Sequence, residues 1–439
     1  MFKIRPLKKI RTSLEIGGDK SISHRAIILS SISQGKTEIN NFLHSEDTLA
    51  TLQAFQNLGV NIKYNDFQKK VSVEGKGKYL NSKNITLQMK NSGTTIRLIS
   101  GVLSAQKFSS TLQTYSSLKR RPMLRITQPL RQMGADIKGR KKGVEEYPPL
   151  KIKPVDFLKG IEYRLAVPSA QVKSCLLLAG LFAQGKTSII EPYQSRDHTE
   201  RMLKIFGAKI RVNRRLISIE DSQLQGPSEI FIPSDFSSAS FFIALATLTK
   251  GARLLLKKVS INPTRLGFLR VLRRMGAKFR FININKNYFE PYADILVEHC
   301  QLRGTKIKEG EIPLMIDELP LLFVLACLAK GKTQILGLKE LKVKETDRIK
   351  SMEYNLKKMG AKFSVKEYLN PQKEKDWKVE IEGPAKFKDA SIKSFSDHRT
   401  AMSLIIGRLS LGREAVIDDI ACIDKSFPEF LITLRKLDK

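Results

Sequence analysis

The stretch RMLKIFGAKI, residues 201–210, indicates the fold because similar stretches recur along the whole chain. Each has the spacing of an apolar helix, then a glycine, then the start of a strand. The other copies are residues 51–62, 126–137, 268–279 and 352–363, and the five glycines are Gly59, Gly134, Gly207, Gly276 and Gly360. Self-similarity at a nearly constant period predicts a repeat architecture. The final stretch FPEFLITLRKL, residues 427–437, is predicted to be a sixth helix of this kind.

A second repeated element supports the same interpretation. It reads SQGKTEI at 33–39, AQGKTSI at 183–189, TKGARLL at 249–255, AKGKTQI at 329–335 and SLGREAV at 410–416. Each copy follows an apolar helical pattern and opens an apolar strand, where glycine suits the left-handed turn that ends a helix. We therefore predict six units of about 73 residues, each with two helices and several short strands. This alternation predicts an α/β fold, and the periodicity allows either one solenoid or two groups of three.

Bulk composition limits the class of protein. A chain of 439 residues suits two or more domains, and 41% hydrophobic residues argue against disorder. No apolar run approaches the ~20 residues that span a bilayer, and the basic N-terminus lacks the apolar core of a signal peptide. The four cysteines form no CxxC pair, so we expect free, mostly buried thiols in a cytoplasmic protein rather than disulfides or a zinc site.

The net charge of +34 raises the alternative of a nucleic-acid-binding protein. The charges are spread along the whole chain, without a long basic block, a basic stripe interleaved with aromatic residues or zinc-finger spacing. A solvated, lysine-rich surface is therefore the simpler interpretation. The same charge would also attract small anionic substrates.

Two stretches predict helix starts that can hold an anion. GDKSISHR, residues 18–25, places a capping residue, Lys20, Ser21 and Arg25 at the start of an apolar helical pattern, and NSGTTIR, residues 91–97, does so with Gly93 and Thr94. A helix N-terminus has unpaired N–H groups and a partial positive charge, which favour phosphate or carboxylate. Taken singly, each stretch is equally well explained as an ordinary capped helix.

Further polar groups precede later helices. Pro122 keeps Arg121 extended and outside the helix that follows, which suits a side chain directed at a ligand. Ser169, Ala170 and Gln171 open another helix and could bind a hydroxylated ligand, and Arg196 lies in the polar stretch SRDHTE, residues 195–200. Solvated surface and helix capping are the alternatives.

Acids and cations cluster in the C-terminal half. MIDELP, residues 315–320, sets Asp317 between apolar residues, an environment that favours a shifted pKa and proton transfer. VKETDR, residues 343–348, is interpreted as helical, with Lys344 and Arg348 four residues apart on one face. DHRTAM, residues 397–402, is predicted to begin a third helix. For any one of these clusters, a salt bridge is the simpler interpretation.

The order of these motifs is more specific than any one of them. GDKSISHR, NSGTTIRL, RRPM, SAQVKS, RDHTE, MIDELP, VKETDR, DHRTAM and KSFPEF form a series that resembles the 5-enolpyruvylshikimate-3-phosphate (EPSP) synthase family, from about residue 11 to the end. The resemblance implies two similar domains, each of three βαβαββ units. It places them at 19–233 and at 1–18 plus 234–439, with the active site in the cleft between them.

The resemblance also implies the reaction and its residues. Phosphoenolpyruvate would transfer its enolpyruvyl group to the 5-hydroxyl of shikimate 3-phosphate through a tetrahedral intermediate, releasing phosphate without a metal or redox cofactor. Asp317 would be the base, Glu345 the proton donor, and Lys20 a third catalytic group, although the sequence leaves open which of the three moves which proton. The implied ligands of shikimate 3-phosphate are Lys20, Ser21, Arg25, Ser169, Ala170, Gln171, Arg196, Asp317 and Lys344. Those of phosphoenolpyruvate are Lys20, Gly93, Thr94, Arg121, Gln171, Arg348, Arg399 and Lys425. The family default is a cytoplasmic monomer without nucleic-acid or membrane partners.

The chain departs from the family's usual sequence at one pair of residues. Thr114-Tyr115 replaces a frequent Gly-Asp pair. GDKSISHR, SAQVKS and RDHTE are similar to the subgroup that tolerates the inhibitor glyphosate. Gly93, however, stands where a tolerant form has alanine, and Lys425 where it has a non-basic residue, so we predict sensitivity to glyphosate. The rival is the related UDP-N-acetylglucosamine enolpyruvyl transferase family, which carries a loop cysteine where this chain has Ser116.

Overall fold

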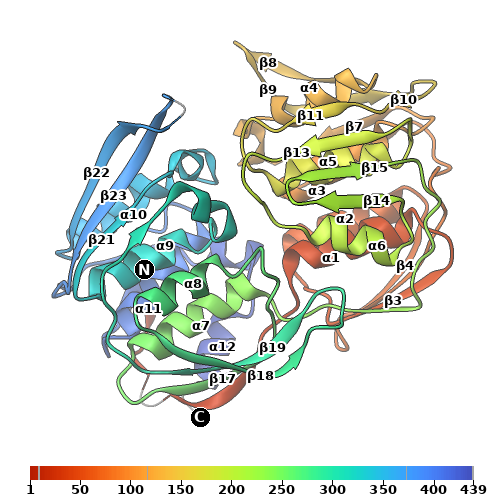
Figure 1. The fold of residues 1–439 in the computed structure, drawn as a ribbon. Coiled ribbons are helices and arrows are strands. Elements are labelled where there is room, and N and C mark those ends of the chain that lie inside the picture. Colours follow the sequence, from red (N-terminus) through yellow and green to blue (C-terminus); the bar gives the residue numbers. More distant parts are fainter. Residues whose placement is uncertain (8–9, 116, 372, 438–439) are drawn as a thin grey trace. The chain divides into compact units, whose positions relative to one another are not determined.

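The computed structural model describes residues 1–7, 10–115, 117–371 and 373–437. The chain forms two compact units (Figure 1), which are described separately. The N-terminal unit is Gly18–Ile232, and the C-terminal unit combines Met1–Gly17 with Pro233–Lys439. The N-terminal unit and the second segment of the C-terminal unit each begin one residue earlier than the boundaries expected from the sequence.

The N-terminal unit alternates helices with short strands. Its helices are α1 (Lys20–Ser31), α2 (Glu46–Asn57), α3 (Gly93–Leu103), α4 (Leu124–Gln132), α5 (Ala170–Gly180) and α6 (His198–Ile205), with a 3₁₀ turn η1 (Leu118–Arg120). Its strands are β3 (Lys36–Asn40), β4 (Asn61–Asn65), β5 (Lys70–Glu74), β6 (Ile85–Gln88), β7 (Ser110–Gln113), β8 (Asp136–Lys142), β9 (Glu145–Lys153), β10 (Leu158–Lys159), β11 (Glu162–Arg164), β12 (Ala183–Gln184), β13 (Thr187–Ile190), β14 (Ile210–Asn213), β15 (Leu216–Ile219) and β16 (Glu229–Phe231).

One four-stranded sheet occurs three times in this unit. The orders are β16-β3-β5-β4, β6-β7-β9-β8 and β11-β13-β15-β14. In each, the first pair is parallel and the other two pairs are antiparallel. The first sheet is completed by β16 from the far end of the unit, with Ile230 opposite Ile39. The last strand of the unit therefore completes the sheet of its first repeat.

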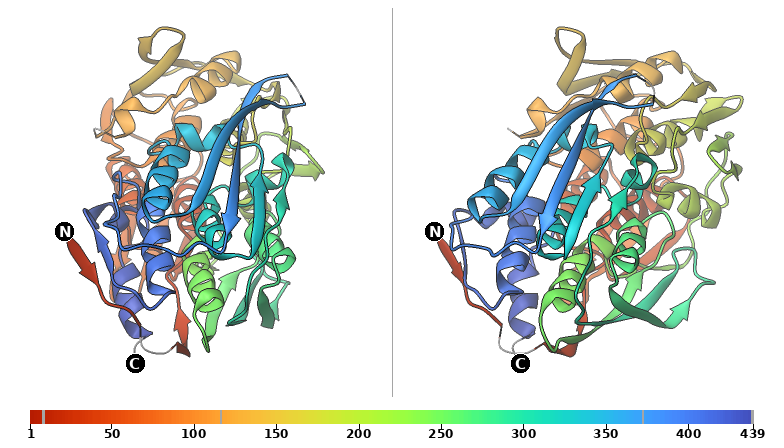
Figure 2. Two further views of the ribbon diagram at one scale, coloured as in Figure 1. Left: turned by 90° about the vertical axis from the view of Figure 1, so that its left-hand side faces the viewer. Right: turned by 60° about the vertical axis from the view of Figure 1, so that its left-hand side comes forward.

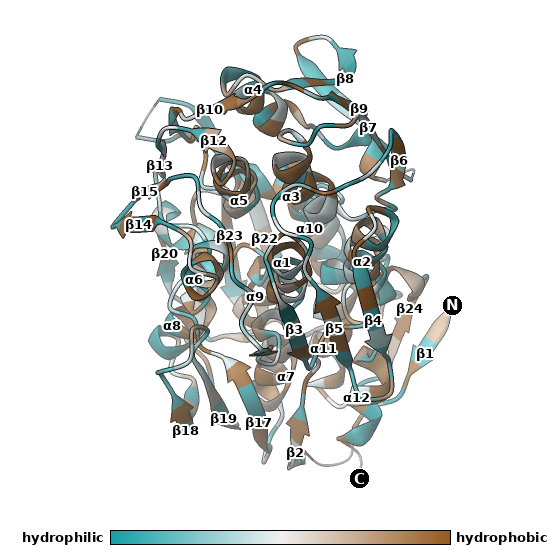
Figure 3. Cartoon of the chain, turned by 90° about the vertical axis from the view of Figure 1, so that its right-hand side faces the viewer, coloured by the Kyte–Doolittle hydropathy of each residue, from teal (hydrophilic) through white to brown (hydrophobic). Residues whose placement is uncertain are grey.

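The helices of the N-terminal unit form an inner and an outer set. In α1, α3 and α5 nearly every residue after the first turn is buried, and α3 and α5 are rich in hydrophobic residues (brown in Figure 3). The outer helices α2, α4 and α6 bury one face, as their patterns of buried residues show. Because inner helices are enclosed by their neighbours, only their ends can present polar side chains to a ligand.

The C-terminal unit repeats this plan. Its helices are α7 (Phe236–Leu248), α8 (Gly267–Arg274), α9 (Leu319–Leu328), α10 (Arg348–Lys358), α11 (His398–Leu409) and α12 (Phe430–Lys436), with 3₁₀ turns η2 (Glu309–Leu314), η3 (Lys339–Val343) and η4 (Ala421–Lys425). Its strands are β1 (Phe2–Ile4), β2 (Arg11–Glu15), β17 (Arg253–Ser260), β18 (Lys278–Asn285), β19 (Tyr292–Glu298), β20 (Lys306–Ile307), β21 (Gly331–Ile335), β22 (Lys362–Leu369), β23 (Lys375–Gly383) and β24 (Ala415–Ile417).

Two of its sheets have the same order as those above, β2-β17-β19-β18 and β20-β21-β23-β22. Figure 2 shows the β22–β23 hairpin as two long strands. The third sheet is reduced: β24 pairs antiparallel with β1 and makes a parallel bridge between Ile417 and Ile392. The predicted α/β fold of six related units is confirmed, and the sixth unit has lost part of its sheet.

The repeated glycines occupy the conformation predicted for them. Gly59, Gly134, Gly207, Gly276 and Gly360, which end outer helices, all have φ between 78° and 96°. The second set, Gly35, Gly185, Gly251, Gly331 and Gly412, has φ between 67° and 94°. A side chain is strained in this region, so glycine is required on conformational grounds.

The remaining bulk predictions concern thiols and membranes. All four cysteines are free, and Cys175, Cys327 and Cys422 are buried while Cys300 is partly exposed. No helix in the described ranges is long and apolar enough to cross a membrane.

Candidate functional site

The inner helices of the N-terminal unit begin at the residues that the sequence predicts. Asp19 caps α1 by accepting from the Ile22 amide at 2.9 Å, Ser92 caps α3 through Thr95 at 3.2 Å, and Ser169 caps α5 through Val172 at 3.4 Å. Each cap satisfies one of the unpaired N–H groups of its helix and leaves the others available. These three helix starts therefore combine N–H donors with a partial positive charge.

Side chains tie the starts of α3 and α5 together. Arg97 Nη1 donates to Gln171 Oε1 at 2.6 Å, and Gln171 Nε2 donates to Thr94 Oγ1 at 2.9 Å. Gly93 lies against the same group, since a Cβ built on it would stand 2.7 Å from Arg121 Nη1 and 3.2 Å from Arg97 Nη1. Arg121 is extended, at φ −90° and ψ 131°, as Pro122 predicts. Two guanidinium groups, an amide and a hydroxyl thus surround one helix start.

Arg97 was not among the site residues expected from the sequence. It lies four residues after Gly93 on α3, so helical spacing places it on the same face. That spacing was visible in NSGTTIR and could have identified it.

Arg25 connects three helices. Its Nε donates to Thr199 Oγ1 at 2.6 Å, its Nη2 to Ser174 Oγ at 2.7 Å and its Nη1 to the Ser21 carbonyl at 2.8 Å. Lys20, at the start of α1, pairs with Asp47 of α2 at 3.2 Å. Arg196 precedes α6 and is partly exposed, as are Ser21, Ser169 and Gln171. The predicted anion-binding residues therefore lie at helix starts that share hydrogen bonds.

Behind Lys20, a buried histidine links α1 to α2 and α3. His24 Nδ1 lies 2.6 Å from Thr51 Oγ1, which lies 2.7 Å from Thr95 Oγ1 beside the cap of α3. Burial, and then the charges of Lys20 and Arg25, hold the pKa of His24 well below its ordinary value. His24 is therefore neutral at physiological pH and does not add charge to the site.

In the C-terminal unit, one buried guanidinium holds three carboxylates. Arg348, 2% exposed, lies 2.9 Å from Asp397 through Nε, 2.6 Å from Glu345 through Nη2 and 3.5 Å from Asp317 through Nη1. Asp397 also caps α11, where Oδ1 accepts from the amides of Arg399 and Thr400 at 2.8 and 3.1 Å. The acids of the three predicted motifs are thus brought together on one cation.

Burial and the charges of this cluster shift the pKa values of two cations, Arg348 and Lys344. Burial opposes the charge of Arg348, but Asp397, Glu345 and Asp317 more than offset it, and its pKa is raised. Burial lowers the pKa of Lys344, and the positive charge of Arg348 adds to this effect, while Asp317 and Glu345 oppose it. Lys344 therefore loses its proton at lower pH than an ordinary lysine.

One local prediction is wrong. Lys344 was expected to lie on the same helical face as Arg348, but it is extended at φ −81° and ψ −153°, and α10 begins only at Arg348. Asp347 ends the non-helical segment by accepting from the amides of Ile349 and Lys350, both at 3.1 Å. A capping aspartate outweighed the charge spacing, and its position was a signal that the sequence contained.

The other predicted residues of this unit are more peripheral to the cluster. Arg399, in the first turn of α11, is buried with its Cζ 5.9 Å from the ring of Phe241. Lys425 ends η4 and is partly exposed. Ser116 lies outside the described residues. Its neighbours tie the loop to the segment before α3, since the Tyr115 amide donates to the Lys90 carbonyl at 2.8 Å and Ser117 Oγ to Asn91 at 2.6 Å.

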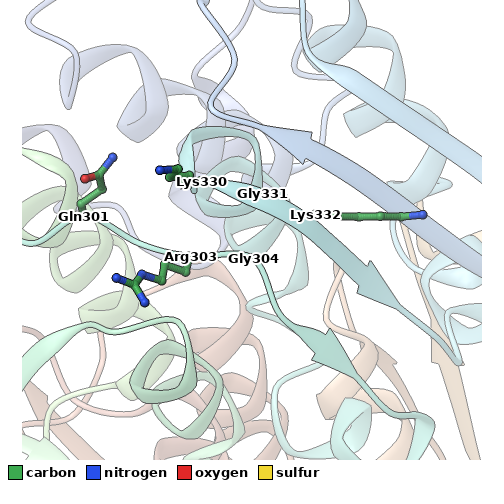
Figure 4. Close-up of a pocket in the computed structure, with 6 residues that line it drawn as sticks. All are labelled: Gln301, Arg303, Gly304, Lys330, Gly331 and Lys332. Carbon is green, nitrogen blue, oxygen red and sulfur yellow. The ribbon is translucent and has the colours of Figure 1, made fainter.

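A surface hollow of about 510 Å³ lies elsewhere in the C-terminal unit (Figure 4). It is lined by Gln301, Arg303, Gly304, Lys330, Gly331 and Lys332. Lys330 and Gly331 follow the last residues of α9, whereas Asp317 precedes the first. A helix C-terminus carries partial negative charge, which accounts for cations there without an anionic ligand. Among the described residues, no group of three or more His, Cys, Asp or Glu side chains could hold a metal ion.

Comparison with known proteins agrees with this geometry. The family model described as EPSP synthase (3-phosphoshikimate 1-carboxyvinyltransferase) matches residues 4–434. Proteins named 3-phosphoshikimate 1-carboxyvinyltransferase from Petrotoga mobilis and Thermodesulfovibrio yellowstonii are 45% and 44% identical, over 99% of both chains in each case. The crystal structure of the Acinetobacter baumannii EPSP synthase superposes with a TM-score of 0.85 at 41% identity, covering 99% of this chain and 97% of that one.

The enolpyruvyl transferase NikO of Streptomyces tendae has the same fold, at a TM-score of 0.74 and 14% identity, so the likeness to this wider class of proteins is one of architecture. Within this class, the chain belongs to the EPSP synthase family. It is an enzyme that transfers the enolpyruvyl group of phosphoenolpyruvate to the 5-hydroxyl of shikimate 3-phosphate and releases phosphate, in the shikimate pathway to the aromatic amino acids.

Proposed function

We propose that the two clusters divide the work of this reaction between anion binding and proton transfer. The N-terminal unit supplies cations, hydroxyls and helix N-termini without an acid in the first turn of α1, α3 or α5. The C-terminal unit supplies three carboxylates around Arg348. Two phosphorylated carboxylate substrates need cations to bind and acids to move protons, and in this proposal the N-terminal cluster supplies cations whereas the C-terminal cluster combines cations with the acids.

Each substrate is proposed to contact residues of both units. Shikimate 3-phosphate binds through Lys20, Ser21, Arg25, Ser169, Ala170, Gln171 and Arg196 of the N-terminal unit and through Asp317 and Lys344 of the C-terminal unit. Phosphoenolpyruvate binds through Lys20, Gly93, Thr94, Arg121 and Gln171, together with Arg348, Arg399 and Lys425. Arg97 joins the second set because it donates to Gln171 and lies beside Arg121 and Gly93. In this proposal, one reaction uses residues of both units.

The proposed proton transfers balance without a redox step. Asp317 takes the proton of the 5-hydroxyl of shikimate 3-phosphate while the oxygen of that hydroxyl bonds to C2 of phosphoenolpyruvate. Glu345 donates a proton to the C3 methylene of phosphoenolpyruvate, which becomes a methyl group. The C2–O bond to phosphate then breaks as C3 loses a proton to a base, which restores the double bond. Two general acid–base steps of this kind each contribute about 10² to 10⁴ in rate, and no metal is required by the chemistry.

Arg348 has a positioning role in this proposal. Because it contacts both Asp317 and Glu345, it sets the distance between the proposed base and the proposed donor. Its Nη1 is buried and makes no hydrogen bond among the described residues, although it pairs electrostatically with Asp317. That N–H is therefore suited to an incoming carboxylate or phosphate oxygen.

Two finer predictions accompany this function. We expect the chain to act as a monomer in the cytoplasm, and we expect it to discriminate against UDP-N-acetylglucosamine. Neither nucleic acid nor a membrane has a role in the mechanism.

The test is release of phosphate from phosphoenolpyruvate by the purified chain, with shikimate 3-phosphate or UDP-N-acetylglucosamine as parallel acceptors. We expect release with shikimate 3-phosphate alone. Release with the nucleotide sugar, or labelling of the protein by phosphoenolpyruvate, would assign the chain to the rival chemistry. Release with neither acceptor would contradict the proposed division of roles.

A further inference from the structure

A lysine in the interior of the N-terminal unit is not used by the proposed mechanism. Lys173, in the second turn of α5, is 1% exposed. Its Nζ lies 2.6 Å from Glu200 Oε1 and 2.9 Å from Glu191 Oε2, and these two acids are 3% and 2% exposed. A charged triad buried this completely loses the hydration of three ions, so its presence requires an explanation.

The two acids come from either end of one short segment. Glu191 directly follows β13, and Glu200 lies in the first turn of α6. Between them runs the polar stretch that carries Ser195 and Arg196. Glu191 also accepts hydrogen bonds from the Ser195 hydroxyl and, at 3.3 Å, from the Ser195 amide. Lys173 therefore binds both ends of this segment, and Glu191 holds the residue next to Arg196.

A second contact fixes the same elements. Ser174 directly follows Lys173, and Thr199 directly precedes Glu200. The hydroxyl oxygens of Ser174 and Thr199 lie 2.6 Å apart. Arg25 donates to both hydroxyls. The start of α6 is thus joined to α5 by an ionic contact and by a neutral one, and α1 is joined to both helices.

We infer that Lys173, Glu191 and Glu200 form an ionic clamp that positions the 191–200 segment, and with it Arg196, relative to Ser169, Ala170 and Gln171 at the start of α5. This inference rests on the proposed assignment of those residues to shikimate 3-phosphate. The clamp residues are positioning residues, because each acts on the ligand through another side chain. The clamp should therefore govern binding of shikimate 3-phosphate and leave phosphoenolpyruvate largely unaffected.

Burial and charge pairing act differently on the cation and on Glu200 of the clamp. Burial would lower the pKa of Lys173, but the charges of Glu200 and Glu191 more than offset it, so the pKa is raised. Burial raises the pKa of Glu200, and Lys173 opposes that rise. Replacing a buried ionic cluster with apolar or neutral groups is often neutral or even stabilising, whereas removing one partner is strongly destabilising. Stability and positioning can therefore be separated by choosing the variants.

Lys173→Met leaves two buried carboxylates without a cation, so we expect a lower Tm. The triple variant Lys173→Met, Glu191→Gln, Glu200→Gln removes every charge of the clamp and should recover most of the Tm. We expect it to keep a KM for shikimate 3-phosphate raised about 10- to 100-fold, because a small misplacement of binding groups is costly. The KM for phosphoenolpyruvate should change by less than about threefold, since most of its proposed ligands lie elsewhere.

Lys78 supplies the matched control. It is 4% exposed, pairs with Asp221, and lies 5.3 Å from the ring of Phe182, beyond the C-terminal end of α5. Lys78→Met also removes a buried lysine from this unit, yet it should leave the KM values of both substrates unchanged. Calorimetric titration with shikimate 3-phosphate alone should reproduce the loss of affinity in the triple variant.

The outcomes separate the clamp from the site assignment. A triple variant that recovers both Tm and the KM for shikimate 3-phosphate would overturn the inference and leave the cluster a purely structural role. Arg196→Ala tests the assignment independently. If Arg196→Ala weakens shikimate 3-phosphate binding but the triple variant does not, the clamp fails and the assignment stands. If the triple variant weakens binding and Arg196→Ala does not, the part of the inference that acts through Arg196 is overturned, and the clamp is left to act through the start of α5.

Discussion

The starts of α5 and α11 occupy the same place in their repeats but carry opposite chemistry. Ser169 caps α5 and is followed by Ala170 and Gln171, all neutral. Asp397 caps α11, and the carboxylate that accepts the Arg399 amide also binds Arg348 of α10. One repeated helix start thus serves as a neutral donor site in the N-terminal unit and as part of an acid cluster in the C-terminal unit. The architecture supplies the field of a helix N-terminus, and the residues placed there decide its use.

A second pair of helices, α1 and α7, begins with the same backbone geometry in both units. Asp19 caps α1 at φ −62° and ψ 126°, and Asp235 caps α7 at φ −64° and ψ 119°. Each accepts from the amide three residues ahead, at 2.9 and 3.0 Å. The backbone geometry of these helix starts is therefore shared by the two units, and the chemical difference between α5 and α11 comes from their side chains, which predicts different kinetic consequences for mutations in each unit.

Among the proposed site residues, Asp317 should give the largest effect on kcat, and it tests the acid side of the comparison. Asp317→Ala should lower kcat by about 10² to 10⁴, because it removes the proposed general base. Steady-state kinetics with saturating substrates measures this effect. Glu353→Gln is the control, since Glu353 belongs to the same unit and its one ion pair within the described ranges is with Lys357 of α10, at 2.7 Å. A near-normal kcat in Asp317→Ala would reject the role.

Arg121 tests the proposed anion-binding role of the N-terminal unit. Arg121→Ala should raise the KM for phosphoenolpyruvate by about 10- to 100-fold, the worth of one or two charged hydrogen bonds. The KM for shikimate 3-phosphate should change less. Arg120→Ala removes an exposed neighbour and should have no effect. The opposite order of the two KM changes would mean that the binding residues are assigned to the wrong substrates.

Gly93 tests how closely the cations approach the helix start. Gly93→Ala should displace Arg121, whose Nη1 would otherwise lie 2.7 Å from the new Cβ. We expect a several-fold higher KM for phosphoenolpyruvate and weaker inhibition by glyphosate than in the wild type. The Tm should not fall, because alanine favours a helix over glycine by about 1 kcal/mol. Undiminished turnover of the wild type in millimolar inhibitor would contradict the predicted sensitivity.

Lys344 should give the smallest effect, visible in the pH profile. Its cation exists below its pKa, and burial together with Arg348 lowers that pKa from 10.5. As pH rises, kcat/KM for shikimate 3-phosphate should therefore begin to fall below pH 10.5. In Lys344→Arg the guanidinium stays charged, so the alkaline limb should move to higher pH. Coincident alkaline limbs would show that Lys344 does not contribute its charge to binding.

Local features of the structure followed from the sequence to within a residue or two. The left-handed glycines, the helix starts beside Asp19, Ser169 and Asp397, and the extended Arg121 were predicted, because each depends on contacts within about four residues. Lys344 was misplaced because charge spacing is a weaker signal than a capping aspartate. The reduced sixth sheet was not predicted, since the helix and glycine signals of that repeat are intact.

By itself, the sequence determined the sixfold repeat, the approximate positions of most helix starts and the identity of the polar groups there. Only tertiary structure decided that Arg348 gathers Asp317, Glu345 and Asp397, and that Lys173 bridges Glu191 and Glu200. Tertiary structure also decided the pairing of β2 with β17 and of β16 with β3. Caps and turns act over a few bonds, whereas these contacts join distant segments, and their partners are selected by the packing of whole helices and sheets.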